Sequence, residues 1–91
     1  MGQPQLPPEV SLPDAPRARH LGDLVRGETR WSVYLESTGQ GGSARGRVHF
    51  VSGPRHRITG WIFLEWSEQA VYDRFGEFSP AELWKLLESL G

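Results

Sequence analysis

The chain has 91 residues, a formal net charge of −1 and no cysteine. This length accommodates one small domain, and the missing cysteines exclude disulfides, thiolate metal sites and cysteine nucleophiles. No apolar run approaches the roughly 20 residues of a membrane span, and no secretory signal stands at the N-terminus. We therefore expect a cytoplasmic protein that uses neither a membrane nor a cofactor.

The small net charge conceals an uneven distribution along the chain. Residues 45–57 contain four arginines and two histidines but no acid, whereas residues 65–91 contain six acids against Arg74 and Lys85. We expect a basic sheet beside an acidic helical layer. Nine of the ten basic residues are arginine, whose planar guanidinium favours forked hydrogen bonds to carboxylates or phosphates.

The N-terminal third contains few core residues. Residues 1–16 hold five of the seven prolines, which predicts a flexible proline-rich arm that either lies in solvent or docks into a partner. In residues 17–29, Leu21, Leu24 and Val25 share one helical face, but two glycines weaken a helix. We predict a short helical turn or an irregular connection there.

The middle of the chain predicts a three-stranded antiparallel meander. Residues 30–37 alternate between apolar and polar side chains, as a half-buried strand does. After a flexible loop at 38–44, two further strands at 45–52 and 56–66 form a hairpin around a tight turn. In the third strand the alternation places four residues toward the core: Ile58, Ile62, Leu64 and Trp66.

Two helices are predicted after the meander. Ser67 is suited to cap the first helix, and Gly76 to end it. Ser79, Pro80 and Glu82 form a stronger start signal: a cap, a proline in the first turn and an acid that closes a capping box. The fold class is therefore α+β: residues 30–91 form one domain, in which the meander packs against two C-terminal helices.

The sequence offers no catalytic constellation. The three histidines lack metal-ligand spacing, and the serine of Ser52-Gly53-Pro54 lacks the preceding glycine of a nucleophile elbow. We expect neither an enzyme nor a metal protein.

The predicted outward face of the sheet is the candidate binding site. Arginines beside exposed aromatic rings are typical of protein-interface hot spots and also of platforms for single-stranded nucleic acid. A third interpretation is that the N-terminal segment covers this face with Leu21, Leu24 and Val25. We expect a small protein-interaction or regulatory module that binds a protein partner or forms a homodimer, with nucleic-acid binding as the alternative. The predicted face comprises Arg45, Arg47, His49, Arg57, Trp61 and Phe63.

Overall fold

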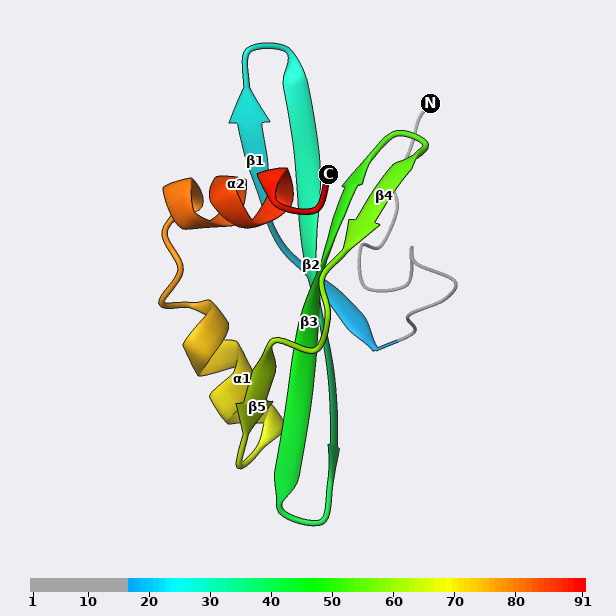
Figure 1. The fold of residues 1–91 in the computed structure, drawn as a ribbon. Coiled ribbons are helices and arrows are strands. Elements are labelled where there is room, and N and C mark those ends of the chain that lie inside the picture. The colour runs from blue at the N-terminus through cyan, green and yellow to red at the C-terminus, as the bar shows by residue number, and fades with distance from the viewer. Residues whose placement is uncertain (1–16) are drawn as a thin grey trace, which may run out of the picture.

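A computed structural model describes residues 17–91; the predicted arm, residues 1–16, lies outside the described residues. The α+β class is confirmed, because an antiparallel sheet packs against two C-terminal helices (Figure 1). The sheet has more strands than the predicted three. The elements in chain order are β1 (Ala18–Arg26), β2 (Thr29–Gln40), β3 (Ser43–Ser52), β4 (Arg55–Ile58), β5 (Phe63–Glu65), α1 (Glu68–Phe75) and α2 (Pro80–Glu88).

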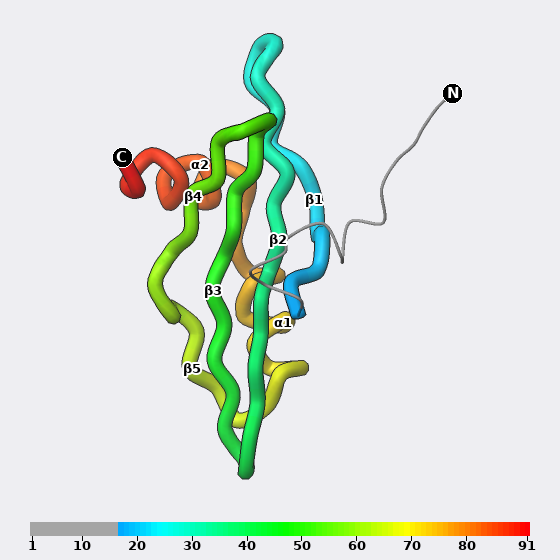
Figure 2. The backbone as a smooth tube through the Cα atoms, turned by 90° about the vertical axis from the view of Figure 1, so that its right-hand side faces the viewer, coloured from blue at the N-terminus to red at the C-terminus, as the bar shows by residue number. Residues whose placement is uncertain are grey.

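The sheet is a meander in the order β1-β2-β3-β4, and β5 continues the outer edge beside the first residues of β3. Figure 2 shows the strands side by side with the helices behind them. Each hairpin turns at a glycine with positive φ, which suits glycine because it has no Cβ. Gly41 and Gly42 both have positive φ, as a two-residue turn that matches the strand twist requires.

Both helices begin at the predicted caps. The Ser67 hydroxyl accepts a hydrogen bond from the Ala70 amide, and Ser79 and Glu82 form the full capping box. The first turn of α1 is also fixed to the sheet. The Ser37 hydroxyl donates to Glu68 at 2.8 Å, and Arg17 donates to the other oxygen of the same carboxylate at 2.8 Å.

The core lies between the sheet and the helices. Cross-strand pairs such as Val33–Phe50 and Leu35–Val48 direct their side chains toward α1 and α2, which contribute Val71 and other apolar residues. The opposite side of the sheet, the open face, has neither helix over it (Figure 1). Among residues 17–91, no helix is both long enough and apolar enough to cross a membrane.

Three local predictions differ from the structure. The segment expected as a helical turn or irregular connection is strand β1, and it pairs beside β2 instead of covering the open face. The flexible loop expected at 38–44 shortens to the turn at Gly41 and Gly42, because β2 and β3 extend into it. The single strand expected at 56–66 is divided into β4 and β5.

Candidate functional site

The structure brings four of the six predicted face residues together and separates the other two. Arg45, Arg47 and His49 follow one another on the open side of β3, and the Trp61 ring lies against the two arginines. The other two predicted residues were wrongly placed. Arg57 pairs with Phe50 on the helix-covered side, and Phe63 lies in the core.

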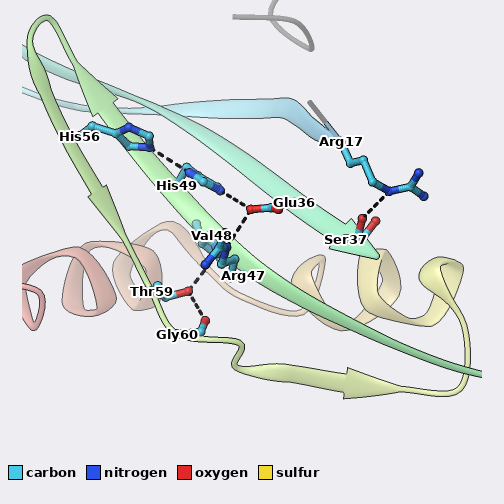
Figure 3. A network of polar contacts seen from close by, with 9 residues as sticks. All are labelled: Arg17, Glu36, Ser37, Arg47, Val48, His49, His56, Thr59 and Gly60. Atoms are coloured by element: carbon cyan, nitrogen blue, oxygen red, sulfur yellow. Dashed lines mark hydrogen bonds and ion pairs between the residues drawn. The ribbon is translucent and has the colours of Figure 1, made fainter. Parts of the chain in front are cut away.

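Arg57 and Phe63 lie on the helix-covered side because the hairpin register reverses the predicted faces of the strand: Arg57 pairs with Phe50, and Phe63 pairs with Gly46. The pairing with β3 is also interrupted between β4 and β5. The Thr59 amide donates to the Val48 carbonyl at 3.0 Å, but the Val48 amide donates to the Thr59 hydroxyl, also at 3.0 Å. The hydroxyl then donates to the Gly60 carbonyl at 2.7 Å (Figure 3). A side chain thus replaces a strand carbonyl, and the ladder is interrupted until β5 resumes pairing with β3 at Phe63.

Trp61 and two arginines form the first part of the site. The guanidinium carbons of Arg45 and Arg47 lie 4.4 and 4.2 Å from the centroid of the Trp61 ring, within cation–π range. Arg47 also donates to Glu36 at 2.7 Å, which neutralises its charge locally. Arg45 has no acidic partner among residues 17–91, so its forked donors are available to a ligand.

A relay of side chains forms the second part of the site. His49 Nε2 lies 2.8 Å from the Glu36 carboxylate, and His49 Nδ1 lies 2.9 Å from His56 Nε2 (Figure 3). A carboxylate only accepts hydrogen bonds, so His49 Nε2 carries the hydrogen and donates it to Glu36. In neutral His49 the other nitrogen then accepts from the N–H of His56.

The charges of the relay follow from burial. Burial lowers the pKa of the His49 imidazole below its ordinary value, and the nearby positive charges of His56 and Arg47 act in the same direction, against the raising effect of Glu36. Burial alone acts to raise the pKa of the Glu36 carboxyl. The hydrogen bonds from Arg47 and His49 outweigh it and keep that pKa below its usual range. A neutral imidazole therefore connects an ionised carboxylate to His56.

This relay does not have the form of a metal centre. Glu36 binds the nitrogen of His49 that points away from His56, so the three side chains form a line instead of converging on one point. Within residues 17–91, no group of three or more histidine, aspartate or glutamate side chains is arranged to hold a metal ion.

A groove at the end of β3 and β5 forms the third part of the site, which the sequence prediction missed. Its volume is about 680 Å³. Leu64 and Trp66 line it with 73% and 84% of their surfaces exposed, although the alternation of the strand predicted both as core residues. Large apolar side chains are rarely left this exposed at adjoining positions without a function. The residues lining the groove include Thr38, Gln40, Arg45, Leu64, Glu65 and Trp66.

Comparison with protein-family models, with curated proteins and with solved structures finds no match to this chain.

Proposed function

We propose that this chain is a small, non-enzymatic protein-interaction module of the cytoplasm. It binds a protein partner, or a second copy of itself, through a recognition surface that consists of Arg45, Trp61, Leu64 and Trp66. The observation that carries the proposal is the exposure of Leu64 and Trp66 beside the acid-free guanidinium of Arg45. Tryptophan and arginine dominate the energetic centres of protein interfaces, where they are surrounded by apolar contacts.

The charge of the surface supports a protein over a nucleic acid. Nucleic-acid affinity grows with the number of phosphates that lysines and arginines neutralise. Arg47 of β3 already forms an ion pair with Glu36. Arg45 is then the arginine of this strand that has no acidic partner among residues 17–91. Arg57 lies on the other side of the sheet. One free guanidinium beside two exposed apolar side chains suits a partner segment with a carboxylate next to apolar residues.

The test uses the immobilised full-length chain and a nuclease-treated lysate of its source cells. We expect the wild type to retain one protein in near-stoichiometric amount. Trp66→Ser should reduce the retained amount at least about tenfold, because interface tryptophans commonly contribute about 2 kcal/mol or more, and Leu64→Ser should reduce it by a smaller factor. Glu28→Ser is the matched control. It changes an exposed residue in the β1–β2 turn, at the opposite end of the sheet from the groove (Figure 1), and should have no effect.

A parallel titration tests the alternative function, nucleic-acid binding. The wild type and Arg45→Glu are titrated with single- and double-stranded RNA and DNA from low to near-physiological salt. Saturable binding that weakens steeply with salt and disappears in Arg45→Glu, without any retained protein, would replace the proposal with nucleic-acid recognition.

A further inference from the structure

Two arginines of β4 lie over one tryptophan ring on the helix-covered side of the sheet. The guanidinium carbons of Arg55 and Arg57 are 4.7 and 5.7 Å from the centroid of the Trp31 ring, and Trp31 is buried. Arg57 pairs with the core residue Phe50, and Arg55 points to the same side because side chains alternate along a strand. Two positive charges are therefore neighbours above a buried apolar ring.

These two charges have no acidic partner among residues 17–91. In this part of the chain, five other arginines each form an ion pair with an aspartate or glutamate, whereas Arg55 and Arg57 form none. Like charges on one side of a strand repel each other, and the repulsion is stronger where a buried side chain excludes water. A bound anion would replace this repulsion by attraction.

The other two places in the described chain where arginine lies over tryptophan each include a carboxylate. Arg26 lies 4.0 Å from the centroid of the Trp84 ring and donates to Glu88 at 3.2 Å. Beside the Trp61 ring, Glu36 accepts from one of the two arginines. A ring face attracts the charge of a guanidinium but leaves most of its five N–H donors without an acceptor. The arginines of β4 therefore lack the acceptor that both other arrangements contain.

A hydroxyl group lies beside the two arginines. Ser52 pairs directly with Arg55 across β3 and β4, is half-buried, and points to the same side as Phe50. Two forked guanidinium groups and a hydroxyl suit an anion with several acceptor oxygens. A phosphate group offers three such oxygens and nearly two negative charges, whereas a carboxylate offers two oxygens and one charge.

We propose that Arg55, Arg57 and Ser52 bind a dianionic phosphate group, either free or as a monoester of a small molecule. This site and the groove lie on opposite sides of the sheet and at opposite ends of β3. Arg55 pairs with the last residue of β3, whereas β5 pairs with its first residues (Figure 1). The inference goes beyond the proposed function, and either one can fail without the other.

The test follows the arginine side-chain Nε–H resonances of the full-length chain by nuclear magnetic resonance. Inorganic phosphate, glycerol phosphate or acetate replaces chloride at constant ionic strength, near pH 7.5, where phosphate monoesters are mainly dianions. We expect saturable shifts of the Arg55 and Arg57 signals with at least one phosphate, and at least about tenfold weaker binding of acetate, which carries one charge.

The two phosphates distinguish the sources of the ligand. Equal affinities would identify the phosphate group alone as the ligand, and tighter binding of glycerol phosphate would identify an ester. The absence of saturable shifts with both phosphates, or equal affinities for phosphate and acetate, would overturn the proposal.

A matched pair of variants supplies the second readout. Arg55→Gln should weaken phosphate binding at least about tenfold, because hydrogen bonds between charged groups are among the strongest. The control Arg19→Gln removes the same charge from an exposed arginine of β1, at the other edge of the sheet, and should change the affinity less than about twofold because salt screens distant charges. Equal losses in the two variants would contradict the site.

Two further substitutions separate charge from geometry. Arg55→Lys keeps the charge and an aliphatic stem over Trp31 but loses the fork, so it should bind phosphate more weakly than the wild type and more tightly than Arg55→Gln. Ser52→Ala removes the hydroxyl alone and should weaken binding by a smaller factor than Arg55→Gln. Wild-type affinity in Arg55→Lys and Ser52→Ala together would show general charge attraction and would contradict the proposal.

Discussion

His49 is a buried imidazole held between two polar partners. Glu36 accepts from its Nε2, and while the ring is neutral its Nδ1 accepts from His56. Protonation of both histidines would place two N–H groups against each other. The charged groups that face the ring are Glu36 from β2, Arg47 from β3 and His56 from β4.

This arrangement predicts a stability that depends on pH. Because the folded-state pKa of His49 lies below its unfolded value of 6.5, unfolding takes up a proton. The stabilisation is present above pH 6.5 and is lost as the pH falls toward the folded pKa, with a slope of at most about 1.4 kcal/mol per pH unit. The Glu36 contribution is lost only at lower pH, because its folded pKa lies below 4.5.

The measurement is urea unfolding at pH 7.5 and pH 5. We expect the wild type to lose free energy of unfolding between the two pH values. His49→Gln, which has no imidazole to protonate, should lose clearly less. The same loss in both proteins would contradict the account of His49.

Thr59 is a second buried residue whose side chain makes a hydrogen bond to the backbone. Its buried hydroxyl accepts from the Val48 amide and thereby closes the sheet where β4 ends. In Thr59→Val the shape is kept but the amide loses its acceptor. We expect a loss of about 1–3 kcal/mol in the free energy of unfolding, the cost of an unsatisfied buried donor.

The control for this substitution is Thr29→Val at the exposed start of β2, which should change stability by less than about 0.5 kcal/mol. Similar values for the two variants would show that the Thr59 hydroxyl does not hold β3 and β4 together.

At the scale of elements, Gly46 sets the distance between β3 and α1. A Cβ at this position would lie 2.5 Å from a methyl carbon of Val71, whereas a Cβ at Gly22 would meet nothing within 4 Å. We expect Gly46→Ala to destabilise the fold by about 1–3 kcal/mol through overpacking. Gly22→Ala should be neutral or slightly stabilising, because alanine restricts the unfolded chain.

Thermal unfolding of Gly46→Ala and Gly22→Ala checks this prediction. Val71→Ala is also measured in the wild type and in the Gly46→Ala variant. The clash predicts that Val71→Ala costs less stability in the Gly46→Ala background than in the wild type. Equal costs in the two backgrounds would mean that α1 does not approach β3 this closely.

The elements with local signals were predictable. The capping box at Ser79 and Glu82 and the turn at Gly53 depend on residues close in sequence, and both are confirmed. Strand β1 was not predictable in this way. A bulge between His20 and Gly22 shifts its alternation, so that its apolar residues have helical spacing.

The site was predictable only in part, for a similar reason. Arg45, Arg47 and His49 share a face because β3 alternates regularly. The break after β4 depends on the hydrogen bond from the Val48 amide to the Thr59 hydroxyl. These residues are far apart in sequence, so no local sequence pattern predicts the break. The faces of β4 and β5 were predicted in reverse for another reason: the register of the turn pairs Arg57 with Phe50, and in the same phase β5 places Phe63 on the core side and Leu64 on the open face.

In the whole molecule, the two sides of the sheet differ: both helices lie on one side (Figures 1 and 2) and enclose the core there. The open face carries the relay of Glu36, His49 and His56 and, at one end, the proposed recognition surface. The proposed binding would leave the core undisturbed, because Arg45, Leu64 and Trp66 are not part of it.

Site-specific photo-crosslinking in the source cells tests protein recognition at Trp66 most directly. A benzoylphenylalanine replaces Trp66 in one variant and Glu28, in the distant β1–β2 turn, in the other. We predict one defined protein adduct from position 66, or an adduct of twice the chain mass if the partner is a second copy, and none from position 28. The addition of Arg45→Glu should weaken the adduct. Equal adducts from both positions, none from position 66, or an adduct to nucleic acid there would contradict recognition of a protein through this surface.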